Sequence, residues 1–164
     1  CSHPRNMSDI MLRDLASAGG VVQINFYPKF IDNDFADEKF LRLSEEGEKW
    51  QELYRSDLYN EVYRDNYFRI MEELSVYPAP SVKRVADHID HAVEKAGAEH
   101  VGLGSDFDGI EIAPEGLRDI SMYGNIAVEL RERGYREQDI RGIMGGNLLR
   151  VMHEALRKAQ TSAD

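Results

Sequence analysis

Residues 100–109, His-Val-Gly-Leu-Gly-Ser-Asp-Phe-Asp-Gly, constrain the fold more than any other part of the sequence. The apolar run 101–104 is too short, and its side chains are too small, for an amphipathic helix, and it follows a predicted helix that ends near Ala96. A helix that leads into a short buried strand is typical of a parallel α/β sheet. The sequence therefore predicts an α/β fold in which Asp106 and Asp108 lie at the C-terminal end of a strand, where such folds place their chemistry.

The two aspartates also fit a simpler interpretation. Aspartate and glycine are frequent in turns, and Gly109 can supply a backbone conformation with positive φ. An acidic turn without chemistry and a catalytic loop are equally compatible with this spacing. Both interpretations stay open until other parts of the chain are considered.

Composition argues against several classes of protein. A chain of 164 residues with 42% hydrophobic content can bury one core and is not disordered. None of its apolar runs approaches the roughly 18 to 20 residues that cross a bilayer. The formal net charge of -10 argues against a nucleic-acid partner. The single cysteine, Cys1, excludes an internal disulfide framework and a zinc site made of cysteines alone, which favours a cytoplasmic location.

The first residues indicate a sequence that begins inside a longer polypeptide. They contain no initiator methionine and no charged segment followed by an apolar one, and any signal peptide would lie upstream. Ser8 is the predicted N-cap of a short helix that Gly19 and Gly20 end, and a strand is predicted at residues 21–27. This is one helix-to-strand step of an α/β fold.

Residues 32–80 are predicted to form a helical insertion between two strands of the sheet. Between Asp32 and Glu73 there are thirteen acidic and six basic residues, interleaved with aromatic ones. The acidic excess predicts a solvated face, and the aromatic side chains predict packing rather than a ligand-binding box.

A further predicted helix begins after Ser81 and carries His88 and His91 on its polar side. Histidines three residues apart can meet on one helix face and bind a metal, but two without a third ligand nearby are a weak signal. We expect them to be structural groups that support the site. The Gly-Gly-Asn sequence at 145–147 can hold an anion, although a turn between helices explains it as well. Other helices are predicted at about 122–133, from about 136, and at about 146–159.

Taken in order, the motifs of the chain resemble the membrane (renal) dipeptidase family of zinc peptidases, and the likeness covers nearly the whole chain apart from the insertion. They are His3-Pro4-Arg5-Asn6, Gly20-Val21-Val22 with Asn25-Phe26-Tyr27, Asp87-His88-Ile89-Asp90-His91, residues 100–109, and Gly146-Asn147-Leu148-Leu149-Arg150. The resemblance implies a (β/α)8 TIM barrel, of which residues 1–164 would be the C-terminal half with a helical insertion and C-terminal helices. It also implies hydrolysis of dipeptides through a zinc-bound water at a two-zinc centre.

The resemblance assigns roles to particular residues. Asp106 matches the catalytic acid/base at the end of the last barrel strand. Arg5 matches the arginine that binds the substrate's terminal carboxylate, a task for which a guanidinium is well suited. Asn25 and Tyr27 are expected to line the substrate pocket, and Asp108 is expected to support the loop.

The chain departs from the family pattern in two ways. Phe30 lies near the position where some relatives present a tyrosine to the substrate, so that hydroxyl is absent. The family's zinc ligands are expected upstream of Cys1, and none maps onto this sequence. We therefore expect two Zn²⁺ per complete site, bound only with the N-terminal half of the barrel; the expected partners are that half, a dipeptide and, as an option, a second copy in a homodimer. Because half a barrel leaves strand edges unpaired, the isolated chain is expected to aggregate or form a non-barrel oligomer.

Three other functions are compatible with parts of the sequence. A strand followed by Asp-x-Asp-Gly also resembles the nucleophile loop of haloacid-dehalogenase-type phosphohydrolases, but those proteins place it near the start of the domain and need a later lysine and acidic pair. A calcium loop would need more oxygen ligands at close spacing, but the apolar Ile110 and Ile112 occupy the next positions where such ligands would stand. An inactive binding fragment built from the barrel is the non-enzymatic alternative.

Overall fold

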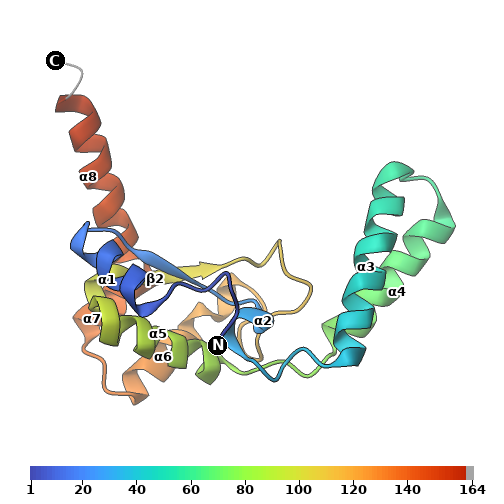
Figure 1. Ribbon diagram of the computed structural model, residues 1–164, viewed down its shortest axis with the longest axis horizontal. Helices are drawn as coiled ribbons and strands as arrows, with labels where there is room; N and C mark the ends of the chain where they lie inside the picture. The colour runs from blue at the N-terminus through green and yellow to red at the C-terminus, as the bar shows by residue number, and fades with distance from the viewer. Residues whose placement is uncertain (162–164) are drawn as a thin grey trace.

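The body of the molecule is built on two parallel strands. In the computed structural model, which describes residues 1–161, β1 (Val22–Asn25) pairs with β2 (Val101–Ser105) in the same direction. The helix α5 (Val82–Ala96) lies between them in sequence and packs against both strands. Figure 1 shows this body at one end of the molecule. The parallel pair with its helical crossover confirms the predicted α/β class.

The pairing of the strands is irregular where they end. Ile24 lies opposite Leu103, whereas Asn25 lies opposite Ser105, so one residue of β2 is left without a partner. Directly after this bulge, Ser105 and Asp106 have φ values of 31° and 76°. A bulge followed by left-handed backbone turns the chain away from the sheet, and it re-aims the side chains at this edge.

The main core lies between the strands and the helices that cover them. Four residues of α5 are buried in it, which are Val85, Ala86, Ile89 and Ala92. The covering helices that contribute to this core are α6 (Tyr123–Glu132) and α7 (Glu137–Arg141), while α1 (Asp9–Ser17) packs against α5. The last helix, α8 (Asn147–Thr161), starts against η3 and extends away from the body (Figure 1). Shorter turns complete the chain at η1 (Ala98–His100), η2 (Ile120–Met122) and the π-type turn η3 (Gly142–Gly146). The sequence therefore predicts the helices of this region well, to within a few residues.

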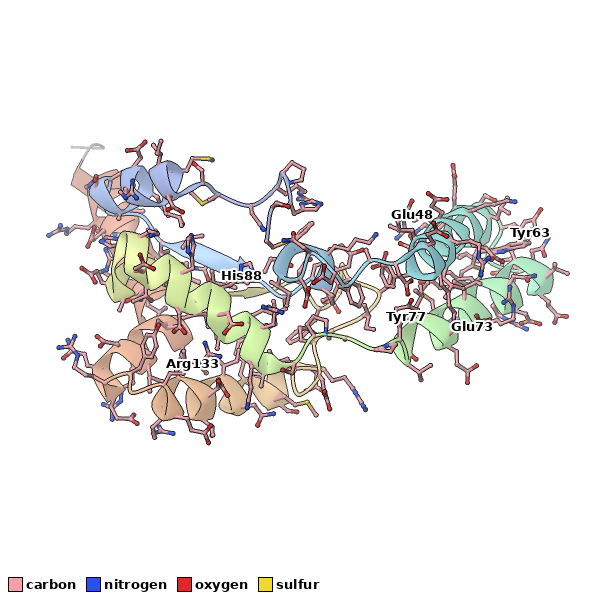
Figure 2. The ribbon with its side chains drawn as sticks, turned by 60° about the horizontal axis from the view of Figure 1, so that its bottom comes forward. Glu48, Tyr63, Glu73, Tyr77, His88 and Arg133 are labelled. Carbon is pink, nitrogen blue, oxygen red and sulfur yellow. The ribbon has the colours of Figure 1, made fainter. Side chains whose placement is uncertain are left out.

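The insertion is a helical hairpin that projects away from the body, as both ribbon views show (Figures 1 and 2). After the short helix α2 (Pro28–Ile31), it consists of α3 (Glu38–Ser56) and α4 (Glu61–Ser75). The hairpin has its own small core, which includes Phe40, Leu43, Ile70 and Leu74. Gly47 allows the two helices to approach, because a Cβ there would lie 3.2 Å from Cγ2 of Ile70. The predicted helical character and aromatic packing of this segment are confirmed.

One expectation about the body needs correction. The strand predicted at 21–27 is shorter, because Pro28 starts a helix and the backbone leaves the sheet after Asn25. The described residues 1–161 contain the two paired strands β1 and β2, as a part of a barrel would. Within the described range, none of the helices is both long and apolar enough to span a bilayer.

Candidate functional site

The predicted catalytic aspartate lies where the two strands end together. Asn25 closes β1 and Asp106 follows β2, and their side chains meet: Nδ2 of Asn25 donates a hydrogen bond of 3.0 Å to Oδ2 of Asp106. These residues are 81 positions apart in the sequence. Parallel pairing brings them together because the carboxyl ends of parallel strands share one edge. The structure thus unites two of the four residues that the sequence predicts to be catalytic or substrate-binding.

The turn after β2 holds the backbone and one side of Asp106. The N–H of Gly109 donates to the carbonyl of Asp106 at 2.9 Å, and a Cβ at position 109 would collide with Oδ1 of the aspartate. The positive φ that the acidic-turn interpretation gives to Gly109 is not found, because the left-handed residues of this loop are Ser105 and Asp106. A side chain at 109 would instead require the Asp106 carboxylate to shift. A non-glycine residue in the left-handed region is a strained conformation of the kind that gathers at functional sites.

Asp108 does not take up the supporting role expected of it among the residues described. Its side chain is exposed, and within residues 1–161 its carboxylate forms no hydrogen bond or ion pair. The two aspartates of the loop are both exposed but differ in their contacts. Asp106 accepts a hydrogen bond from Asn25, whereas Asp108 has no such partner among the described residues.

Tyr27 links the end of β1 to the base of the insertion. Its backbone N–H donates to Oδ1 of Asn25 at 2.7 Å, while its hydroxyl is near Glu111 and Ser44. Burial raises the pKa of the Tyr27 hydroxyl, and the negative charge and hydrogen bond of Glu111 raise it further. Ser44 in turn donates to Glu111 at 3.4 Å. Sequence reasoning missed Ser44 and Glu111, because neither lies in a motif and only tertiary folding brings them to Tyr27.

Arg5 is exposed, and its guanidinium carbon lies 5.2 Å from the ring centroid of Phe30. Phe30 is buried on its other sides, and the ring of His3 also contacts it with a centroid distance of 4.5 Å. Phe30 therefore forms an apolar platform under the guanidinium, an arrangement that favours a cation over the face of a ring. Phe30 thus contacts one face of the guanidinium, while the donors of the exposed Arg5 stay accessible to an anion.

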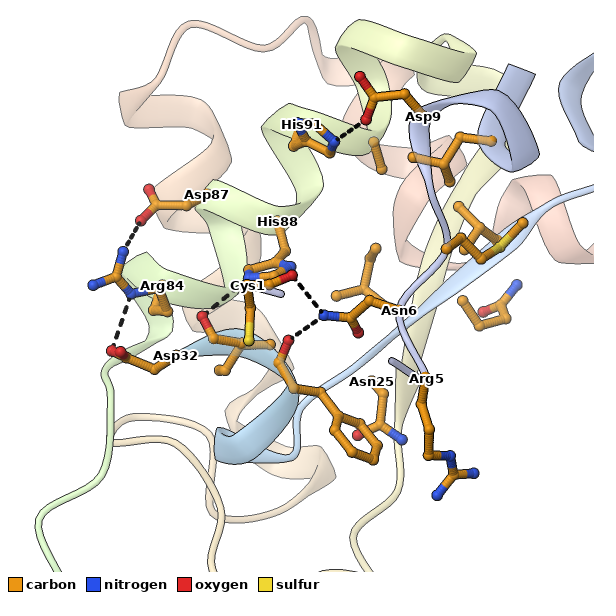
Figure 3. Close-up of a pocket in the computed structure, with 18 of the residues that line it drawn as sticks. Cys1, Arg5, Asn6, Asp9, Asn25, Asp32, Arg84, Asp87, His88 and His91 are labelled. Atoms are coloured by element: carbon orange, nitrogen blue, oxygen red, sulfur yellow. Dashed lines mark hydrogen bonds and ion pairs between the residues drawn. The ribbon is translucent and has the colours of Figure 1, made fainter. Parts of the chain in front are cut away.

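A cavity of about 880 Å³ lies between the N-terminal segment, β1 and α5. Its lining includes Arg5, Asn25, His88 and His91, but neither Asp106 nor Tyr27. Figure 3 shows Arg5 and Asn25 toward one end of it and His91 toward the other. Asn25 is the residue common to the cavity lining and the Asp106 contact.

The two histidines of α5 are directed to different partners. Nε2 of His88 donates to the carbonyl of Ile31 at 3.0 Å, and Nε2 of His91 lies 2.9 Å from Oδ1 of Asp9 (Figure 3). Burial lowers the pKa of His88. Although desolvation opposes it, the hydrogen bond from His91 lowers the pKa of Asp9. These contacts connect α5 with α2 and α1, and each histidine is bonded to a different element.

The two aspartates of the same motif, Asp87 and Asp90, contact residues at and just after the end of α6. Nη1 of Arg133 bonds Asp87 at 2.8 Å and Asp90 at 2.6 Å, and the hydroxyl of Tyr135 donates to Asp90 at 2.6 Å. Figure 2 labels Arg133 between α5 and α6. Although burial opposes it, the hydrogen bonds that Arg133 donates to Glu129 and Asp90 raise the pKa of its guanidinium. The motif at 87–91 thus connects α5 with α1 and α2 through its histidines, and with the end of α6 through its aspartates.

The Gly-Asn motif near the last helix also serves the fold. Nδ2 of Asn147 donates to the carbonyls of Ala98 and Val101, both at 2.7 Å, and the amide is buried. Arg150 donates to the carbonyl of Glu99 at 2.9 Å. These donors satisfy the backbone at the start of β2. The amide of Asn147 is engaged with the chain itself, which favours the interhelix turn over the anion site.

The residues that the structure describes do not assemble a metal centre. Within 1–161, no three histidine, cysteine, aspartate or glutamate side chains converge closely enough to hold an ion. Asp106 and Asn25 supply one carboxylate and one amide that are hydrogen-bonded to each other. A two-zinc ligand set does not fit the groups of this described part of the chain.

Comparisons with known proteins agree on one family. The profile of the membrane dipeptidase family, peptidase family M19, matches residues 1–164. Dipeptidase aclJ from Aspergillus oryzae is 32% identical over 100% of the chain, and an uncharacterized dipeptidase from Schizosaccharomyces pombe is 35% identical over 91%. The chain spans 29% and 26% of the lengths of these two relatives.

Solved structures show the same likeness. The probable dipeptidase PvdM from Pseudomonas aeruginosa superimposes with a TM-score of 0.62 and 26% identity, over 91% of this chain and 40% of that one. A metallopeptidase from Rhodobacter sphaeroides, liganded with a phosphinate mimic of the dipeptide L-Ala-D-Ala, gives a TM-score of 0.56 and 23% identity, over 88% and 30%. The chain therefore belongs to the membrane dipeptidase family, and its two-stranded α/β body is part of that family's barrel.

Proposed function

We propose that this chain supplies the proton-transferring and substrate-binding groups of a zinc-dependent dipeptidase. The observation that carries the proposal is the placement of Asp106 at the shared edge of β1 and β2, held by Asn25 and Gly109. Relatives whose names identify them as dipeptidases support the reaction class, and a phosphinate dipeptide mimic bound to a structural neighbour supports the substrate class.

The roles follow from the chemistry of the groups. A carboxylate at the strand ends can accept a proton from the water that attacks the peptide carbonyl and return it to the departing amine. Arg5 stays charged at any relevant pH and can pair with the substrate's C-terminal carboxylate through two parallel hydrogen bonds. Phe30 contacts one face of the guanidinium, so the N–H donors at its edge are free to bind the carboxylate. Tyr27 contributes to the shape of the site through its contacts with Asn25 and Glu111.

The metal ligands belong to another part of the proposed enzyme. Because the residues described here do not assemble a zinc site, the two zinc ions would be held by groups outside this chain. The unpaired outer edges of β1 and β2 support this view, since a sheet of two strands needs further strands to close a barrel. The isolated chain is accordingly proposed to be inactive.

The phosphohydrolase alternative is not favoured. The match to the dipeptidase family covers residues 1–164, including the aspartate loop itself. Asp108, which would be the general acid in a phosphohydrolase, is exposed and makes no bond within the described residues. The alternative of an inactive binding fragment applies to the isolated chain and not to the complete enzyme.

The test is Asp106→Asn in the polypeptide that carries this chain together with the metal-binding segment. We expect dipeptide turnover to fall about 100- to 10,000-fold, the usual contribution of a general acid/base, with bound zinc unchanged by elemental analysis. Asp108→Asn is the matched control, and we expect its kcat within about threefold of wild type, since surface changes of this kind rarely perturb a site. Full activity of Asp106→Asn with zinc bound would refute the assignment.

A further inference from the structure

We propose that Asn25 is a positioning residue for Asp106, rather than a ligand of the substrate. The inference rests on the proposed function, because it concerns the carboxylate that would carry the proton. It departs from the expectation that Asn25 simply lines the pocket. The contacts of its amide with Tyr27 and Asp106 support the new role.

Both ends of the Asn25 amide are engaged by the chain itself. One end lies 2.7 Å from the backbone N–H of Tyr27, and the other lies 3.0 Å from Oδ2 of Asp106. An N–H can only donate, so the atom that faces it must be the amide oxygen. This fixes the orientation of the amide and directs its NH₂ group at the carboxylate.

Asp106 needs such a partner because its backbone is strained. With φ of 76°, preceded by a residue at 31°, the aspartate leaves the strand in a conformation that few residues adopt. On one side its Oδ1 is against Gly109, and on the other its Oδ2 accepts from Asn25, the only hydrogen bond to its side chain within residues 1–161. The asparagine therefore selects one orientation of the carboxylate. A displacement of a catalytic group by about 1 Å can cost about 100-fold in rate.

The base of the insertion fixes Asn25 in turn. Tyr27, whose backbone N–H donates to the amide oxygen, has its hydroxyl near Ser44 of α3 and near Glu111 of the loop after β2. A continuous set of contacts therefore runs from α3 through Tyr27 and Asn25 to Asp106. The bulge at the end of the strands gives this set its geometry, because it places Asn25 opposite Ser105 and next to the aspartate.

Asn25→Asp in the complete enzyme separates the two roles. The new carboxylate retains an acceptor for Tyr27, but it replaces the donor to Asp106 by a like charge. We expect kcat to fall about 10- to 100-fold, with KM for a dipeptide within about twofold of wild type. Asn66→Asp on α4, where the amide donates to the carbonyl of Val62 at 2.8 Å, makes the same chemical change outside the site, and we expect both constants to stay within about twofold.

The double variant Asn25→Asp/Asp106→Asn tests the contact without relying on activity. It restores one donor and one acceptor with their positions exchanged, so its melting temperature should return toward wild type, whereas turnover stays lost. Additive melting shifts, or an Asn25→Asp enzyme with raised KM and normal kcat, would overturn the inference while leaving the proposed function intact. Absence of dipeptide hydrolysis by the wild-type enzyme would instead overturn the proposed function, and this inference with it.

Discussion

The strand ends and the helical hairpin use polar residues in opposite ways. At the strand ends, Asn25, Tyr27 and Asp106 direct their polar groups toward one another through hydrogen bonds of 2.7 and 3.0 Å. In the hairpin, Arg69 pairs with Glu46 and Glu73, and these three side chains are 39 to 49% exposed. Exposed ion pairs contribute only about 0 to 1 kcal/mol each.

The difference teaches where the chain can tolerate change. The hairpin is stabilised by its own apolar core, and its charges chiefly keep an extended surface hydrated. The strand ends depend on a bulge, two left-handed residues and the amide of Asn25. The contact of Ser44 with Glu111 and Tyr27 is where the two regions meet, at the base of the hairpin.

The largest effect on stability is expected in the body. Ile89 on α5 is fully buried between the strands and the covering helices, so Ile89→Ala should reduce the free energy of unfolding by about 2 to 5 kcal/mol. Val62→Ala in the hairpin, at a side chain that is 62% exposed, should change it by less than about 0.5 kcal/mol. Denaturant titration of both variants in the complete polypeptide provides the measurement. Equal losses of stability would contradict the difference in burial between the side chains of Ile89 and Val62.

A smaller effect, on activity, is expected at the aspartate turn. Gly109→Ala adds a Cβ that collides with Oδ1 of Asp106, so the carboxylate must move and kcat should fall about tenfold. Gly124→Ala on α6 is the matched control, since no heavy atom outside the local helix lies within 4 Å of the new Cβ among the described residues. That control should keep wild-type kcat and gain about 0.5 to 1 kcal/mol of stability from improved helix propensity. A Gly109→Ala enzyme with normal kcat would show that the turn can relax without moving the aspartate.

Local sequence patterns predict which residues reach the strand ends, but not how they meet there. The Gly-rich run before Asp106 and the apolar run before Asn25 are sufficient to place both at the same edge of a parallel sheet. Their direct hydrogen bond depends on the bulge between the strands. Nothing in the alternation of apolar and polar residues predicts an extra residue in one strand, so the positive φ was expected at Gly109 and is found at Asp106.

The histidines illustrate the same limit. A spacing of three places His88 and His91 on neighbouring parts of a helix surface, which sequence alone can predict. Their partners come from α2 and α1, elements that lie far away in the sequence. Spacing along one helix cannot show which other elements will supply acceptors. For that reason the contacts with Ile31 and Asp9 could not be predicted from the sequence, and the supporting role of the two histidines stays a prediction.

The smallest expected effect is a pH dependence at His88, which joins the body to α2 at the foot of the hairpin. Burial lowers its pKa in the folded protein, so between that lowered value and the unfolded value of about 6.5 the unfolded chain binds more protons. The contribution of His88 to stability is therefore complete above about pH 6.5 and is lost as the pH falls. His88→Gln keeps a donor for the Ile31 carbonyl but does not titrate, so its unfolding midpoint in urea should fall less than that of wild type between pH 7.5 and 5. An equal fall in both proteins would locate the acid sensitivity elsewhere, for example in the Asp9 and His91 pair, where Asp9 has a lowered pKa.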